Sequence, residues 1–295
     1  MRKNGFDRLL PYIFILPAAI LIVGVIFYPI LLNMVRSFSG PDGQFTLAHY
    51  QAILSDPIQQ ENIFYTLLIV TVTVLICAIL GYLLALYLRF SKGKIAAWMN
   101  NLYMLPRFIP GLVAVNGMIT IIRDSGLINR ISLAMGSNVT LGLMYDMKGI
   151  ILMNLWFNIP FVMMLLGAGM AKIKDPHIEA AQDVGASLPT IMKDMVWPIT
   201  NRDLLIALTF VFMSNVSSFT TPYLMGGNFP QMLGISLFRR FNEGDYEAAA
   251  AFSVLIFLFS ALATLVYVWV NFKRPAWERA NQNGLQTAKQ ATHSW

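Results

Sequence analysis

Charged residues are scarce in this chain. They make up 12% of its 295 residues, about half of the roughly 25% found in soluble domains. Hydrophobic residues make up 57%, and the mean hydropathy is +0.60. So few charges cannot form a polar shell around so much apolar surface, which excludes a soluble globular fold. The lipid bilayer must therefore serve as part of the solvent of this protein.

Cysteine and histidine are also scarce, and the phosphate-binding motif of P-loop ATPases is missing. Cys77, the single cysteine, lies in an apolar run, where we expect it to pack as a small apolar residue. The three histidines, His49, His177 and His293, lie far apart and match no metal-ligand or Ser–His–Asp spacing. No G-x-x-x-x-G-K-S/T sequence occurs. We therefore expect no catalytic residue, no metal site and no cofactor bound by this chain.

Six apolar runs are long enough to cross a bilayer, for which a helix needs about 20 residues. They cover approximately residues 9–35, 63–88, 96–122, 149–170, 204–224 and 248–271. They predict an all-α integral membrane protein in which residues 1–295 form one transmembrane domain. The third and fifth runs hold the prolines Pro106 and Pro110 and many polar groups. We expect both to be kinked or flanked by broken helix, because proline removes a backbone donor.

The net charge of +6 arises from basic residues that cluster beside the apolar runs. This placement is typical of membrane orientation and argues against nucleic acid as a partner. About two thirds of the Lys and Arg residues fall in segments that are cytoplasmic if the N-terminus lies inside. The bias predicts that both termini are cytoplasmic, including a polar tail at 276–295.

A polar loop at about 171–203 separates the fourth and fifth runs, on the predicted cytoplasmic side. Asp175-Pro176 is expected to cap one short helix, and Gly185 to end it in the left-handed conformation. Ser187 is expected to cap a second helix that stops near Pro198. The result is an L-shaped pair of helices. Taken alone, such a pair is more typical of an interfacial helix that lies on lipid headgroups.

The same loop resembles the EAA loop of the membrane subunits of bacterial binding-protein-dependent ABC importers. The pattern of that family is Glu-Ala-Ala, three residues, Gly, nine residues, Ile, one residue and Leu-Pro. Here Glu179-Ala180-Ala181 stands at the required distance from Gly185. Met195 and Trp197-Pro198 replace the usual Ile and Leu-Pro and keep the apolar character. Six spans with both ends inside also match, so the resemblance extends over nearly the whole chain.

The resemblance implies a type I ABC importer permease-like fold in the bacterial cytoplasmic (inner) membrane. It implies two ATP-binding subunits, a second permease subunit that is identical or homologous, and an extracytoplasmic solute-binding protein. ATP and Mg²⁺ would bind to the ATPase, and the loop would form coupling helices that insert into a cleft on it. The coupling residues that it implies are Glu179, Ala180, Ala181, Asp183, Gly185, Ala186 and Pro198.

The solute is less clearly indicated. Asp183 lies one position earlier than the acidic residue of sugar permeases, and the Thr221-Pro222 segment is similar to polyamine and related permeases. Against this, Leu16-Pro17 and Tyr28-Pro29 would also suit a sugar permease. The resemblance favours a polyamine or another small charged organic solute, with a sugar or oligosaccharide as the alternative.

Polar groups inside apolar runs are costly, which makes them candidates for the solute pathway. The candidates are Asn116, Asn154, Asn158, Ser214, Asn215, Ser218 and Thr221. The last four recur at one, four and seven positions and are expected to share one helical face. An equally open alternative is that these groups link neighbouring helices by hydrogen bonds. Arg107, beside two prolines, is expected to pair or to snorkel, and an unpaired Arg107 would argue against a cationic solute.

Two other classes of function stay open. A secondary transporter would need charged coupling residues inside the spans, where Arg107 is nearly the only one. A membrane scaffold without a transport role would leave the polar loop with no ATPase partner. The outer segments at 40–43 and 124–148 are too polar to span and are expected to dock a solute-binding protein.

Overall fold

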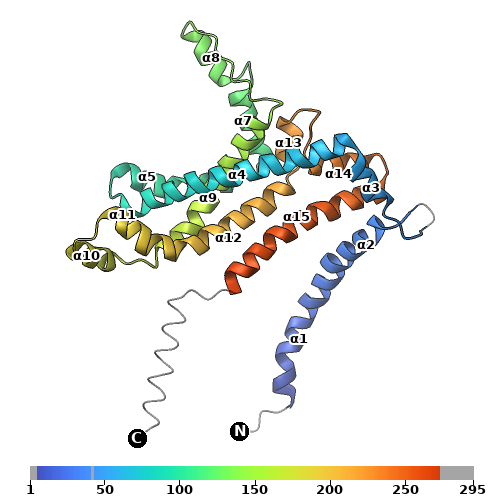
Figure 1. Ribbon diagram of the computed structural model, residues 1–295, viewed down its shortest axis with the longest axis horizontal. Helices are drawn as coiled ribbons and strands as arrows, with labels where there is room; N and C mark the ends of the chain where they lie inside the picture. The colour runs from blue at the N-terminus through green and yellow to red at the C-terminus, as the bar shows by residue number, and fades with distance from the viewer. Residues whose placement is uncertain (1–4, 41–42, 273–295) are drawn as a thin grey trace.

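The computed structural model describes residues 5–40 and 43–272 (Figure 1). Four long helices lie alongside one another and form the body of the protein. They are α4 (Pro57–Phe90), α9 (Met147–Met170), α12 (Trp197–Val216) and α15 (Tyr246–Phe272). The predicted tail at 276–295 lies outside the described residues. Six helical stretches are long and apolar enough to cross a membrane, as the sequence predicted.

The body is closely packed because small residues line the face of α4 that meets α9. Asp56 starts α4 by accepting a hydrogen bond from the Ile58 amide. A β-carbon on Gly81 would lie 2.7 Å from Val162 Cγ1 of α9, so only glycine allows this approach. Cys77 is fully buried in the same core, as expected.

The first predicted span is a single bent rod. It consists of α1 (Gly5–Leu21), the π-helix η1 (Ile22–Phe27) and α2 (Tyr28–Ser37). Of this rod, α2 is the part that packs on α15. There the Asn33 side-chain amide donates to Ser253 Oγ at 2.6 Å. Figure 1 shows α1 leaving the body, and the apolar side chains from Tyr12 to Ile22 are largely exposed within this chain.

The third predicted span, at 96–122, is broken near its prolines, as expected, but its bounds are wrong. That stretch holds α5 (Lys94–Leu102), α6 (Leu105–Phe108) and α7 (Gly111–Ile122), followed by α8 (Leu127–Ala134). Ile109 is extended, with φ −84° and ψ 126°, because the ring of Pro110 disfavours helical geometry before it. The candidate span lies later, at Gly111–Ala134, and Figure 1 shows α7 and α8 projecting from the body.

The fifth predicted span, at 204–224, is wrong at both ends. Helix α11 (Leu188–Ile191), the π-helix η2 (Met192–Val196) and α12 form one run without a break from 188 to 216. The expected stop near Pro198 does not occur, because the wider π-turn at η2 tolerates the missing amide hydrogen of proline. The chain then breaks at 217–219 and resumes as α13 (Thr220–Met225).

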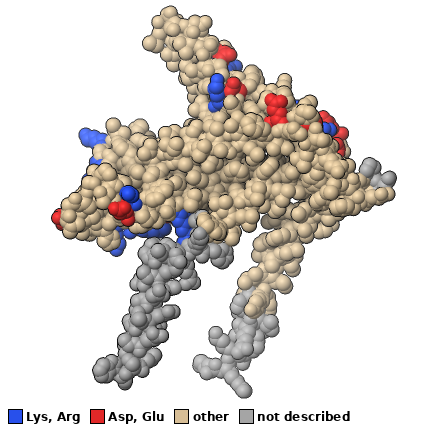
Figure 2. Space-filling view, in the orientation of Figure 1, with Lys and Arg blue, Asp and Glu red and all other residues tan. Residues whose placement is uncertain are grey.

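Three short helices complete the fold: α3 (Ala48–Ser55), α10 (Asp175–Asp183) and α14 (Leu233–Asn242). The face drawn in Figure 2 carries charged side chains near α10 and α11 and again around α7, α13 and α14. The long middle of that face is almost free of charge. A body with an uncharged middle and charged ends suits a bilayer, which penalises charge at its centre.

Candidate coupling surface and solute pathway

The loop between α9 and α12 folds into a hook, residues 175–191, whose corner is Gly185. This glycine has φ +87° in the left-handed region, as predicted. The Ala186 amide donates to Ala181 O at 2.9 Å and the Gly185 amide to Gln182 O at 2.8 Å, which together make a Schellman ending. Ser187 Oγ accepts from the Thr190 amide and caps α11, also as predicted.

The inner side of the hook is fixed to the body by apolar contacts. Ile178 and Ile191 are buried in the core that α4, α9 and α12 share, and Ala181 and Ala186 pack against that core. The three alanines were expected to admit a partner surface, but only Ala180 is exposed. Ala181, on α10, and Ala186, in the turn after it, are half-buried against the body.

An ion pair fixes the start of the hook. Arg89, near the end of α4, donates to Ile173 O and to Asp175 Oδ1, both at 2.6 Å. This hydrogen bond and the charge of Arg89 lower the pKa of Asp175. The expectation that Asp175 caps α10 is wrong: Lys174 holds the cap position, and Asp175 is already inside the helix.

A second ion pair joins the two helices that flank the hook. Lys172 Nζ lies 3.2 Å from Asp203 Oδ2 on α12. The carboxylate of Asp203 sits where a β-carbon on Gly169 would be, so a larger residue there would displace this side chain. The ends of α9 and α12 are thus held in a fixed relation beside the hook.

The outer side of the hook faces away from the body. Val184 is 85% exposed at the corner, between the exposed Asp183 and the open space around Gly185. Glu179 and Leu188 are exposed on the two arms. Pro198 is exposed further along, where α12 begins. This surface pairs an apolar knob with carboxylates, a combination suited to an apolar cleft with a basic rim.

Three of the pathway candidates come together between α9 and α12. The Asn158 side-chain amide donates to Asn154 O at 2.7 Å and lies 3.4 Å from Asn215 Oδ1. All three asparagines are buried, and the Asn215 side-chain amide donates to Val211 O at 2.6 Å. Within the described chain, the Asn154 amide nitrogen has no hydrogen-bond partner. The cluster therefore links two helices and keeps one donor free.

Of the other four candidates, Ser214 borders this cluster, because its hydroxyl accepts from the Asn215 side-chain amide at 3.4 Å, and the other three lie elsewhere. Asn116 lies on α7 and bonds to its own helix at Leu112 O. Ser214 is exposed on α12, whereas Ser218 lies in the break and Thr221 is buried on α13. The predicted shared face is wrong because the helix ends at Val216, before the last two positions.

Arg107 is stacked on an aromatic ring. Its guanidinium carbon lies 5.2 Å from the ring centre of Phe161 on α9. The arginine side chain itself remains exposed. A cation–π contact of this kind is one of the pairings that the sequence left open.

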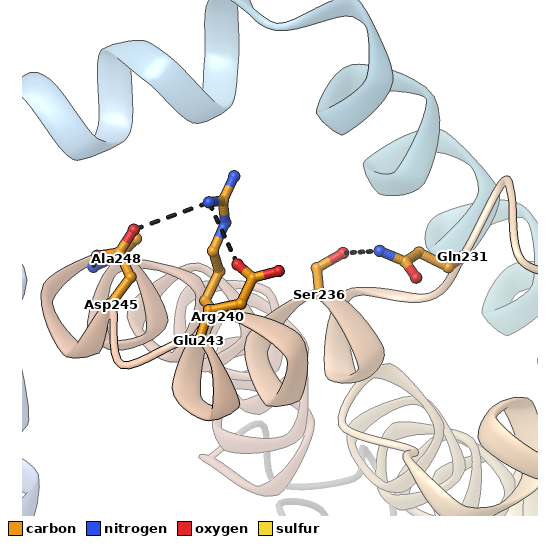
Figure 3. Close-up of polar contacts among 6 residues, drawn as sticks. All are labelled: Gln231, Ser236, Arg240, Glu243, Asp245 and Ala248. Carbon is orange, nitrogen blue, oxygen red and sulfur yellow. Dashed lines mark hydrogen bonds and ion pairs between the residues drawn. The ribbon is translucent and has the colours of Figure 1, made fainter.

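The sequence interpretation missed a polar network at the end of the body opposite the hook. Asn62 Oδ1 accepts from the Gln231 amide at 2.8 Å, and Thr66 Oγ1 accepts from the Leu233 amide at 2.9 Å. Gln231 Nε2 donates to Ser236 Oγ at 3.2 Å (Figure 3). A signal was present, since Asn62 and Thr66 are polar residues at the start of an apolar run.

Beside this network, α14 carries a group of charges. Arg240 Nη1 lies 3.6 Å from Glu243 Oε2 and 3.8 Å from Asp245 Oδ2 (Figure 3). All three side chains are about half exposed, so the pairs add little stability. Glu243 and Asp245 lie in the turn that leads from α14 into α15.

The sequence is similar to known transport proteins. Residues 77–275 match the family described as "Binding-protein-dependent transport system inner membrane component". The chain is 26% identical over 225 residues to the spermidine/putrescine transport system permease protein PotB of Escherichia coli (strain K12), covering 76% of this chain and 82% of that one. It is 35% identical over 127 residues to the thiamine transport system permease protein ThiP of Brucella abortus (strain 2308), which is 43% of this chain and 23% of that one.

The fold is similar to that of solved transporters. A chain of a bacterial alginate ABC transporter, solved with an alginate pentasaccharide-bound periplasmic protein, has a TM-score of 0.76 at 17% identity. That match covers 91% of this chain and 96% of the other. A chain of the MetNI methionine ABC transporter has a TM-score of 0.53 at 16% identity, covering 72% and 95%. At such identities these matches show a shared fold.

Proposed function

Because this chain belongs to the family of binding-protein-dependent transport system inner membrane components, we propose that its hook couples solute import to ATP hydrolysis on separate subunits. The chain is a permease subunit of an ABC importer and has the fold of type I importer permeases. In the proposal, ATP and Mg²⁺ bind to the partner ATPase, and this chain binds no cofactor and catalyses no reaction.

The observation that carries the proposal is the two-sided construction of the hook. Its inner side is anchored by Ile178, Ile191 and the Arg89–Asp175 ion pair. Its outer side presents Glu179, Val184 and other exposed residues around a glycine corner. An interfacial helix that lies on lipid would be expected to turn apolar residues outward along its length. Here the carboxylates of Glu179 and Asp183 face outward beside Val184 and Leu188, which favours a protein cleft.

The helical run from 188 to 216 supports a mechanism for coupling. Its 29 residues span roughly 40 Å at 1.5 Å per residue. It begins inside the hook and ends at the asparagine cluster, where Asn215 meets Asn158. A displacement of the hook would be transmitted to this cluster by a rigid-body movement of α12. The cluster then becomes the proposed point at which the solute pathway opens and closes.

The assembly in the proposal has two ATP-binding subunits, this chain with a second permease subunit, and an extracytoplasmic solute-binding protein. The alginate transporter, a structural neighbour, was solved with such a periplasmic protein. Both termini and the loop at 171–203 lie in the cytoplasm, and residues 1–295 act as one transmembrane domain. The polar network at 62–66 and 231–236 and the charges of α14 then face outward, toward the solute-binding protein.

The proposed solute is a polyamine or another small charged organic molecule. PotB is a spermidine/putrescine permease and ThiP a thiamine permease by name, and all three named solutes are organic cations. The stacking of Arg107 on Phe161 weakens the objection that an unpaired arginine would repel a cation. A sugar or oligosaccharide is the second candidate, favoured by the resemblance of the first span to sugar permeases.

The coupling role is tested by a pull-down of the detergent-solubilised chain from its native membrane, with mass spectrometry of the proteins retained. A Gly185→Ala variant forces a side chain into the left-handed region, at a cost of about 1 kcal/mol or more, and should lose most of the ATP-binding subunit. Gly136→Ala is the matched control, since Gly136 has φ +79° and equally open surroundings in the segment after α8. Equal recovery of the ATPase by both variants would rule out the hook as the docking element.

A further inference from the structure

A cavity lies at the end of the body opposite the hook. Its volume is about 290 Å³, near the lower end of the roughly 300–1,000 Å³ of small-molecule sites. The first turns of α4 form one wall, and the start of α9 and the segment after α13 form the others. Helices α4 and α9 run from this cavity to the hook, where Arg89 and Lys172 make their ion pairs. The cavity therefore belongs to the side that the proposed topology places outside the membrane.

Two carboxylates and several aromatic rings line this cavity. Glu61 projects from α4 and Asp146 from the start of α9. The aromatic lining comes from three of the segments around the cavity: Phe64, Tyr65, Tyr145 and Phe229. No lysine or arginine is among the lining residues, all of which are in the described chain.

The local backbone is shaped to build this lining. Tyr145 has φ +62°, the only positive value among described non-glycine residues. A tyrosine rarely adopts this conformation, which costs on the order of 1–2 kcal/mol. The Tyr145 amide donates to Met225 O at 2.8 Å, and a β-carbon on Gly227 would lie 3.0 Å from Tyr145 O. A side chain at residue 227 would crowd Tyr145 O, so glycine favours this close approach, which closes one side of the cavity.

The chemistry of the lining selects for an organic cation. An ammonium group donates strong hydrogen bonds to ionised carboxylates, which have only acceptors. Aromatic faces attract cations within about 6 Å of the ring centre. Asp146 already accepts from the Lys148 amide at 2.8 Å through Oδ1, which leaves Oδ2 for a ligand. A neutral sugar would donate hydroxyl hydrogen bonds to the two carboxylates but would leave their charge unneutralised, whereas an ammonium group does both. A carboxylate solute would be repelled by them.

We infer that this cavity is a binding site for an organic ammonium ion, built by Glu61, Asp146 and the surrounding rings. The inference rests on the proposed function, in which it is the first site on the permease that the solute meets after leaving the solute-binding protein. It assigns the selectivity for a cation to the outer end of the chain. The asparagine cluster between α9 and α12 then needs no charge of its own.

The inference is tested by calorimetric titration of the purified full-length chain with three probes of the same carbon number. These are 1,4-diaminobutane, 1,4-butanediol and succinate, which differ in charge. Binding should be measurable for the diamine alone and should weaken as salt is raised. Glu61→Gln and Asp146→Asn should each weaken it by about tenfold or more, the effect of losing a charged hydrogen bond. Asparagine remains a good cap for α9, so its fold is kept.

Asp124→Asn is the matched control, because it removes the same charge from an exposed residue outside the cavity. Equal binding of the diamine and the diol, or equal weakening by all three variants, would overturn the inference. The inference would also be overturned if no probe binds and the Glu61 or Asp146 variant instead loses capture of the solute-binding protein.

The pull-down with the Gly185 variant is independent of the solute. Retained coupling without diamine binding would therefore overturn this inference alone, and diamine binding without ATPase capture would overturn the proposed function alone.

Discussion

Glycine at helix crossings sets how closely the helices of this protein approach. Gly81 leaves room for Val162, and Gly169 leaves room for the carboxylate of Asp203. Both lie on surfaces where two helix backbones come near each other, the usual role of small residues in membrane proteins. In contrast, Gly167 has open space where its side chain would be. Gly167 and Gly169 lie in the same helix, but only Gly169 makes room for a neighbouring side chain. Composition does not reveal this difference.

We predict that Gly169→Ala destabilises the protein by about 1–3 kcal/mol, because the new methyl group overlaps Asp203 and displaces its ion pair with Lys172. Gly167→Ala, two residues away in the same helix, should be neutral or slightly stabilising, since alanine is a better helix former. Cys77 is fully buried and is the single cysteine, so its reaction with a maleimide dye on heating reports unfolding. Equal melting temperatures for the two variants would refute the close contact.

At the scale of elements, the sequence predicted the membrane helices better than their ends. The fourth and sixth spans lie within α9 and α15 almost as expected, because long uninterrupted apolar runs leave little choice. The glycine corner and the Ser187 cap also follow from local backbone chemistry. The passage of the helix through Pro198 was not predictable in this way, because it depends on a π-turn.

Contacts between distant elements were the least predictable. The Asn62–Gln231 hydrogen bond joins residues 169 positions apart, and no local pattern marks such a pair. The cavity likewise combines α4, α9 and the segment at 227–230. The predicted coupling residues follow from a motif, whereas the exposure of Ala180 and the partial burial of Ala181 and Ala186 depend on packing against the body.

The polar network at the end of the body opposite the hook predicts a specific loss of stability. Asn62→Ala should cost about 1–3 kcal/mol, because the buried Gln231 amide loses its acceptor and finds no water. Gln60→Ala, two residues earlier, breaks only an exposed hydrogen bond to Leu54 O and should change stability by less than about 0.5 kcal/mol. Thermal unfolding of the two variants in detergent compares these effects. A neutral Asn62→Ala would show that the network does not hold α14 to α4.

At the scale of the whole molecule, the two ends of the body have different chemistry. One end carries the hook with its exposed carboxylates and valine, and the other carries the cavity and the polar network. Between them the face in Figure 2 is almost without charge. The run from 188 to 216 connects the hook with the asparagine cluster. The central claim is that a partner ATPase acts on the hook and that this run carries its movement into the membrane.

The most direct test is photo-cross-linking in native membranes from two positions of nearly equal exposure. Val184, 85% exposed, is at the hook corner, and Met135, 80% exposed, follows α8. Each is replaced by cysteine (Val184→Cys or Met135→Cys) and labelled with benzophenone maleimide, while buried Cys77 stays unreactive. The account predicts an adduct with an ATP-binding subunit from position 184 and none from position 135. A labelled position 184 that gives only lipid adducts, or equal ATPase adducts from both positions, would contradict it.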